Sequence, residues 1–274
     1  MWGNREGWQD DLEDQARRRI AWFAGIVAVA ALAAGGWYWF SSRQTPAPPA
    51  AVAPTPPPTA PPSAEPPVAN PVPQTGSAAL PALNDSDSLV QEGMNSVLGR
   101  AAVEALLVPQ NIVRHIVVTV DNLPRRKVAV ELRPVKVTPG QTVVSTQGEI
   151  TTLSEGNYAR YAPLVRVVQA ADVKALAGLY QRLYPLFQQA YEDLGYPGKY
   201  FNDRLIEVID HLIATPEPVT PIVLRQPKVF WEYADPELEG RSAGQKLLIR
   251  MGAAHARVIK TKLREFRDEV AQKK

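Results

Sequence analysis

Four ionisable side chains follow one another along one predicted helix. Asp203, Glu207 and His211 stand at positions i, i+4 and i+8, with Asp210 beside them, so the first three fall close to one line along the helix. Carboxylates and an imidazole on one helix face can bind a metal ion or share acid–base chemistry. A structural explanation also exists, because negative charge is stabilising near a helix start and Arg204 can form ion pairs with the neighbouring carboxylates. We favour that explanation and expect no catalytic residue, metal site or cofactor.

Other signals of catalysis are missing from the sequence. The three histidines, His115, His211 and His255, lie outside any H-E-x-x-H spacing, and there is no cysteine. The chain also lacks a G-x-S-x-G motif, a phosphate loop and a glycine-rich dinucleotide turn. The sequence therefore favours a binding role over an enzyme.

Aromatic and polar residues crowd two predicted loops, 157–161 and 196–202. Tyrosine with arginine offers rigid contact area and directional hydrogen bonds, which suit the recognition of a glycan or a protein. The alternative is that these rings close the core. Together with the helix that follows, the loops supply the candidate binding residues, which are Tyr158, Arg160, Tyr161, Tyr196, Tyr200, Asn202, Asp203, Arg204, Glu207 and His211.

Helical periodicity and start signals predict most of the C-terminal part. Apolar stripes predict helices over 109–120, from Asp172 to about Gly195, 202–213, 242–251 and 253–271. Pro185 predicts a kink or break in the second of these. Capping boxes are expected at Ser88, Thr152 and Ser242.

Strand signals are fewer. Alternation predicts strands over 127–137, 141–145 and 221–233. The predicted fold class is therefore mainly α with a small β element, and residues 82–274 are long enough to form one globular domain with a single core.

A membrane helix is predicted near the N-terminus. Residues 20–40 are 21 positions without a charge, with tryptophan and phenylalanine at both ends and a tyrosine at the second end. Three consecutive arginines, 17–19, precede the segment and only Arg43 follows closely, so the positive-inside rule puts residues 1–19 in the cytoplasm. A cleaved signal peptide is the alternative. Small residues four apart, such as Ala21 and Gly25, permit a homodimer through this helix.

A disordered linker is predicted over 41–81. This stretch holds 14 of the 26 prolines and almost no large apolar side chain, so it cannot bury enough surface to fold. A polyproline chain of this length reaches on the order of 120 Å if straight. The sequence thus divides into a cytoplasmic segment, a membrane helix, a linker and a periplasmic domain.

The C-terminal domain resembles one bacterial family. Five separate motifs carry the likeness: VDNLPRR at 120–126, NYARY at 157–161, LYPLFQQAYEDLGY at 183–196 continuing as YFNDRLIEVIDH at 200–211, RQPK at 225–228 and SAGQKLLIRMG at 242–252. They are similar to those of domain of unknown function 3014, whose members likewise place a membrane helix and a proline-rich stretch before the domain. The resemblance implies kinship and carries no known reaction.

These features predict a single-pass protein of the bacterial inner membrane, whose periplasmic domain is a binding or scaffolding module of the cell envelope. An envelope protein or peptidoglycan is the expected partner, and nucleic acid is not. One alternative is an envelope enzyme, hydrolase-like, acting on a cell-wall or lipid component through Asp203, Glu207 and His211. A second is an assembly factor for another membrane complex.

Overall fold

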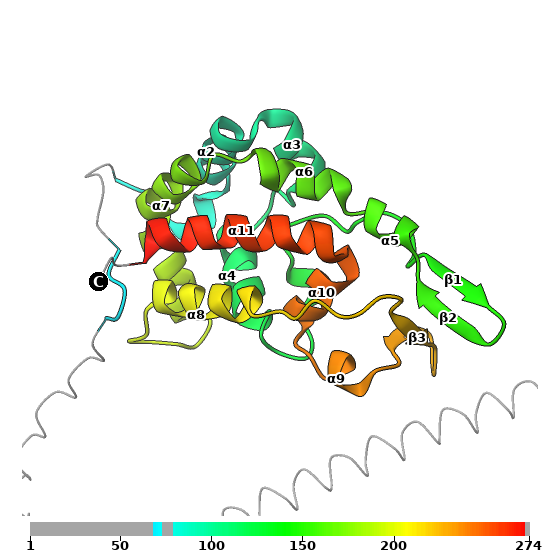
Figure 1. Ribbon diagram of the computed structural model, residues 1–274. Helices are drawn as coiled ribbons and strands as arrows, with labels where there is room; N and C mark the ends of the chain where they lie inside the picture. The colour runs from blue at the N-terminus through cyan, green and yellow to red at the C-terminus, as the bar shows by residue number, and fades with distance from the viewer. Residues whose placement is uncertain (1–67, 73–78, 272–274) are drawn as a thin grey trace, which may run out of the picture. The chain divides into compact units, whose positions relative to one another are not determined.

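The computed structural model describes residues 68–72 and 79–271, which form a helical body with a small sheet at one end (Figure 1). The helices are η1 (Leu83–Asp85), α2 (Asp87–Leu98), α3 (Arg100–Leu106), α4 (Ile112–Asn122), η2 (Val130–Leu132), α5 (Glu155–Ala159), α6 (Ala162–Ala170), α7 (Val173–Asp193), α8 (Phe201–Ile213), α9 (Pro236–Glu239), α10 (Ala243–Met251) and α11 (Ala253–Val270). The strands are β1 (Val144–Gln147), β2 (Ile150–Leu153), β3 (Val223–Arg225) and β4 (Glu232–Tyr233).

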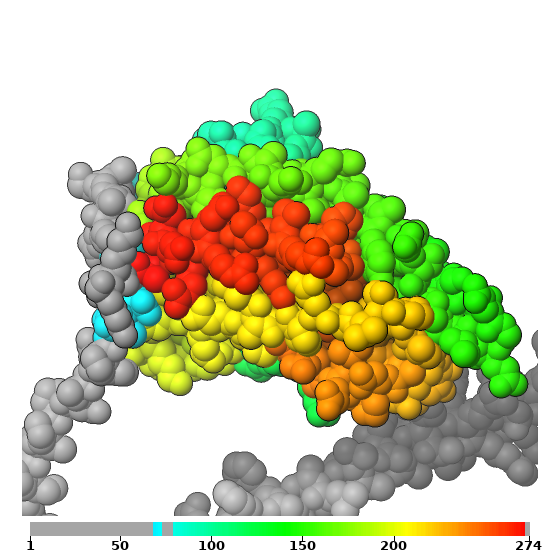
Figure 2. All heavy atoms as spheres, viewed as in Figure 1, coloured from blue at the N-terminus to red at the C-terminus, as the bar shows by residue number. Residues whose placement is uncertain are grey.

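Helix α7 is the centre of the helical body. It contacts α2, α4, α8 and α11, and its buried stripe includes Tyr180, Leu183 and Phe187. This spacing puts the three side chains on one face of the helix, where they exclude water with the apolar faces of the neighbouring helices. On the face seen in Figure 2, α11 lies between α7 and α8.

The four strands form one antiparallel sheet in the order β1-β2-β3-β4. Its buried side contributes Leu153, Leu224 and Tyr233 to a cluster with Ile249 of α10. The β1–β2 hairpin projects from the body (Figure 1). The prediction of a mainly helical fold with a small β element is confirmed.

The predicted strand over 127–137 is wrong. The segment holds the short turn η2 and a single bridge from Val135 to Leu107. Its alternating apolar side chains are largely exposed, with Val130 at 54% and Val137 at 61%. Pro134 lacks a backbone N–H for a ladder, and no neighbouring strand covers the segment. The strand predicted over 141–145 is found shifted toward the C-terminus, as β1, and the stretch 221–233 contains two short strands, β3 and β4, while β2 was not predicted.

Helix starts were predicted with mixed success. Asp172 and Ser242 are N-caps whose side chains accept from backbone N–H groups, as predicted. The other two capping boxes are wrong, because α2 begins after Ser86 and Thr152 lies in β2. Helix α7 continues through Pro185 without a break.

The described part of the chain contains no helix long and apolar enough to cross a membrane. The predicted membrane helix, 20–40, lies outside the described residues. Within the predicted linker, residues 68–72, called here the docked segment, lie against the domain. The N–H groups of Ala69 and Asn70 donate to the Asp203 carboxylate over 3.2 and 2.8 Å.

Candidate functional site

The loop between α7 and α8 forms one wall of a surface groove. Gly195 and Gly198, with φ of 107° and 71°, allow the chain to leave α7 and turn back. Gln188 of α7 fixes the loop, because its Oε1 accepts from the N–H of Phe201 at 2.9 Å and its Nε2 donates to the carbonyl of Lys199 at 2.7 Å. The backbone at the end of the loop is therefore fixed to α7 where α8 begins.

A buried carboxylate lies below this loop. Asp121 of α4 is 3% exposed, and it accepts hydrogen bonds from Arg125 Nη2 at 2.5 Å, Arg204 Nε at 3.2 Å and the Tyr196 hydroxyl at 3.2 Å. A buried charge is tolerated only when it is paired in this way. Asp121 thus joins α4, α8 and the loop.

Stacked tyrosines form the aromatic part of the groove. The rings of Tyr191 and Tyr196 lie 4.6 Å apart at an angle of 20°, and Lys199 Nζ lies 5.6 Å from the centre of the Tyr196 ring. Burial, the largest effect, raises the pKa of Tyr191. Its hydroxyl therefore stays neutral at physiological pH.

Arg204 links the floor of the groove to its rim. Its Nη1 lies 2.8 Å from Glu207 Oε2, while its Nη2 donates to the main-chain carbonyl of Asp121 at 3.1 Å. Burial opposes its positive charge, but hydrogen bonding and attraction to Glu207 and Asp121 outweigh it and raise the pKa of Arg204. The guanidinium is a fixed cation in the groove.

The groove has a volume of about 480 Å³, within the range of ligand sites. It is lined by Asp121, Tyr191, Tyr196, Lys199, Tyr200, Asp203, Arg204 and Glu207. Two cations, three carboxylates and three tyrosines therefore share one surface. Such a surface offers donors, acceptors and aromatic faces to a polar ligand.

Five of the ten predicted site residues line this groove, namely Tyr196, Tyr200, Asp203, Arg204 and Glu207. Asn202 lies beneath it and is fully buried, where it accepts from the Tyr180 hydroxyl at 3.0 Å and donates to the carbonyls of Asn70 and Val270. Asn202 thus connects α7, the end of α11 and the docked segment.

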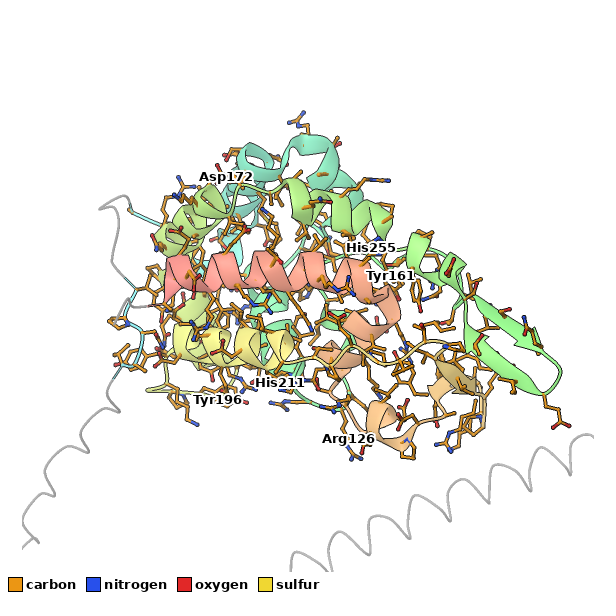
Figure 3. All side chains as sticks on the ribbon, viewed as in Figure 1. Arg126, Tyr161, Asp172, Tyr196, His211 and His255 are labelled. Carbon is orange, nitrogen blue, oxygen red and sulfur yellow. The ribbon has the colours of Figure 1, made fainter. Side chains whose placement is uncertain are left out.

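His211 does not join Asp203 and Glu207 in the groove. Its Nε2 lies 2.8 Å from the Ser242 hydroxyl at the start of α10, and Figure 3 labels it beside α8, where it belongs to the last turn. Because Asp203 accepts from the docked segment and Glu207 pairs with Arg204, each of the three has a separate partner.

The predicted residues of the first loop lie elsewhere. Figure 3 shows Tyr161 near the start of α11, away from Tyr196. The Arg160 guanidinium donates to the carbonyls of Pro139 and Gly140 and to the side chain of Asn157, while Tyr161 is buried in a core cluster. The structure therefore does not bring these residues to the groove.

Sequence reasoning missed Asp121, Tyr191 and Lys199 as groove residues. A signal for Asp121 exists, since it stands four positions after buried Val117 and four before Arg125. A carboxylate on an apolar stripe needs a partner. Its second partner, Arg204, lies 83 positions away, and no spacing rule reveals that contact.

Comparison with known proteins identifies the family. A family model described as protein of unknown function, DUF3014, matches residues 112–267, more than half of the chain, and this range includes every residue lining the groove. No curated protein matches the chain. No solved structure matches it either. The chain belongs to the DUF3014 family of proteins of unknown function.

Proposed function

We propose that this protein is a membrane-anchored binding module of the bacterial cell envelope. In this proposal residues 1–19 lie in the cytoplasm, 20–40 span the inner membrane, and a linker over 41–81 carries the domain in the periplasm. The charge-free segment, the arginines before it and the proline-rich stretch after it support this arrangement.

The tyrosine-lined groove is the observation that carries the binding role. Peptidoglycan consists of sugar rings joined to short peptides that bear both carboxylates and amines. The partly exposed rings of Tyr196 and Tyr200 suit sugar rings. Lys199 and Arg204 suit carboxylates, and Glu207 suits an amine. We therefore propose a peptidoglycan segment as the ligand of the groove.

Sedimentation with isolated peptidoglycan tests this proposal. The full chain, kept in native membrane discs, is mixed with purified sacculi, and the bound fraction is measured after centrifugation. The test variant combines Lys199→Ala with Glu207→Ala, because Glu207 is 68% exposed and neither side chain is among the hydrogen-bond or ion-pair partners of Asp121. The matched control combines Lys174→Ala with Glu269→Ala, an exposed lysine and glutamate on α7 and α11.

The wild type and the control should sediment with sacculi alike, and the test variant should bind at least about tenfold more weakly, as expected for losing 1.4 kcal/mol or more. Equal binding by all three chains would show that the groove does not take part in binding peptidoglycan. Absence of binding by the wild type would exclude peptidoglycan as the ligand.

A photoreactive amino acid in place of Lys199, introduced in living cells, distinguishes a protein ligand from peptidoglycan. Adducts with a protein would identify a protein partner in place of peptidoglycan. The same substitution at Lys174 is the control for random proximity.

A further inference from the structure

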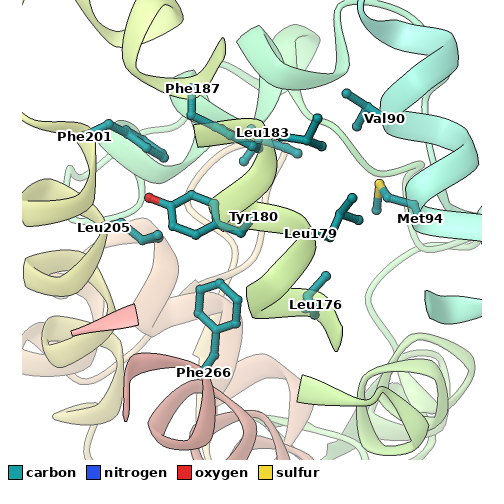
Figure 4. Close-up of a pocket in the computed structure, with 11 residues that line it drawn as sticks. Val90, Met94, Leu176, Leu179, Tyr180, Leu183, Phe187, Phe201, Leu205 and Phe266 are labelled. Atoms are coloured by element: carbon teal, nitrogen blue, oxygen red, sulfur yellow. The ribbon is translucent and has the colours of Figure 1, made fainter. Parts of the chain in front are cut away.

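A second hollow, separate from the groove, lies along the inner face of α7 (Figure 4). Its volume is about 210 Å³. It is lined by Val90, Met94, Ile116, Leu176, Leu179, Tyr180, Leu183, Phe187, Phe201, Leu205 and Phe266, from α2, α4, α7, α8 and α11. None of these residues lines the groove.

The lining offers no free polar group. Tyr180 is its only side chain with an oxygen or nitrogen atom, and the Tyr180 hydroxyl donates to Asn202 at 3.0 Å. Apolar cavities of about 150 Å³ lined by Leu, Ile and Phe stay dry and bind benzene. This larger hollow therefore suits an apolar ligand.

The shape of the hollow favours a chain over a ring. Its lining follows α7 from Leu176 to Phe187, eleven positions, which is about 16 Å at 1.5 Å per residue. A volume of about 210 Å³ lined by side chains from three helical turns implies an elongated hollow, called the channel below. An extended methylene chain fits such a channel along its whole length, whereas an aromatic ring would fill only a part.

The channel is reachable from solvent. Met94, Leu176, Leu179 and Phe266 line it and are each partly exposed. Met94 has a flexible side chain that adapts to different occupants. Because these residues lie on α2, α7 and α11, the proposed entrance lies among those three helices.

We propose that this channel binds one aliphatic chain, either the tail of a free fatty acid or one acyl chain of a phospholipid. Each methylene group that leaves water for the channel strengthens binding about fourfold. The site is independent of the tyrosine-lined groove, so the proposed role in peptidoglycan binding can fail without affecting it.

Photo-crosslinking tests the proposal with two probes on the full chain in detergent-free membrane discs. One probe is a fatty acid with a diazirine in its tail, and the other is a phospholipid with the same group in one acyl chain. Labelled residues are mapped by mass spectrometry. We expect adducts on lining residues of the domain, and the probe that produces them identifies the source of the chain.

Filling the channel provides the control. Leu179→Phe should lower labelling of the lining at least tenfold, while Leu194→Phe, the same change at an exposed position outside the channel, should leave it unchanged. Met94→Trp at the entrance is a second blocking variant in case the first fails to fold, which thermal unfolding reports. Adducts confined to residues outside the lining, or labelling that neither blocking variant lowers, would overturn the proposal.

Discussion

Asp121 is the residue on which the groove depends. It is nearly inaccessible to water, yet it holds Arg125, Arg204 and Tyr196 in place. The net benefit of a buried ion pair is small, but removing one member leaves the other unpaired and costs much more. The carboxylate therefore specifies how α4, α8 and the loop before α8 meet.

Replacing Asp121 with Asn should lower the free energy of unfolding by about 3 kcal/mol, because the shape is kept while Arg204 and Arg125 lose a buried counter-charge. Chemical denaturation measures the loss. Asp193→Asn is the matched control, since it breaks the more exposed pair with Arg114 at 2.9 Å and should cost less than about 1 kcal/mol. Equal losses would show that Asp121 behaves as a surface charge.

At the scale of single residues, the sequence predicted part of the groove. Tyr196, Tyr200 and Arg204 stand out because their residue types are typical of binding surfaces and they are close in sequence. The pairing of Arg204 with Asp121 depends on how α8 packs on α4, which local spacing does not encode. For the same reason Tyr158 and Arg160, similar in type, could not be separated from the groove residues.

At the scale of elements, helices were easier to predict than strands. Periodicity identifies α4, α7, α8, α10 and α11 because each helix satisfies its backbone groups internally. A strand requires a partner elsewhere in the chain. The apolar alternation of 127–137 has no partner strand, whereas β2, which was not predicted, pairs with two strands. The available partners thus decide the outcome more than the local pattern does.

The junction between α10 and α11 requires glycine for two reasons. Gly252 has φ 85° and ψ 155°, a conformation that is essentially restricted to glycine. A Cβ atom at this position would also lie 2.8 Å from the ring of Tyr158. Tyr158 thus packs against the junction of the two helices, a structural role that requires no ligand.

Gly252→Ala should therefore cost more than the backbone strain alone. Gly99, between α2 and α3, has nearly the same φ of 84°, but a Cβ there would meet nothing within 4 Å. Gly99→Ala should lower the free energy of unfolding by about 1–3 kcal/mol. Gly252→Ala should add a further 1–3 kcal/mol, roughly, for the contact with Tyr158.

Thermal or chemical denaturation of both variants measures the difference. Tyr158→Ala combined with Gly252→Ala should recover part of the additional loss, because the smaller side chain leaves room for the new Cβ. If the two glycine variants were equally destabilised, the Tyr158 contact would contribute nothing.

At the scale of the whole molecule, composition alone predicts the order of anchor, linker and domain. The charge-free stretch and the proline-rich stretch are local properties, so they need no knowledge of tertiary structure. The groove and the apolar hollow, by contrast, depend on tertiary structure. Each is lined by helices far apart in the sequence, so neither can be derived from a pattern along the chain.

The proposed topology predicts the result of a fusion experiment. A reporter enzyme that is active only in the periplasm should be active when fused after Lys274. A reporter that is active only in the cytoplasm should be inactive at the same position and active when fused before Met1. The reverse pattern would place the domain on the cytoplasmic side of the membrane.

The docked segment connects the N-terminal part of the chain directly to the rim of the groove. Ala69 and Asn70 hold the Asp203 carboxylate, which is itself a lining residue next to Arg204. Tension transmitted along the chain from its N-terminal side would thus load the first turn of α8 before any other described helix. Force large enough to break these hydrogen bonds would leave the Asp203 oxygens, which already line the groove, free to accept hydrogen bonds from a ligand. The affinity of the proposed ligand would then depend on mechanical load.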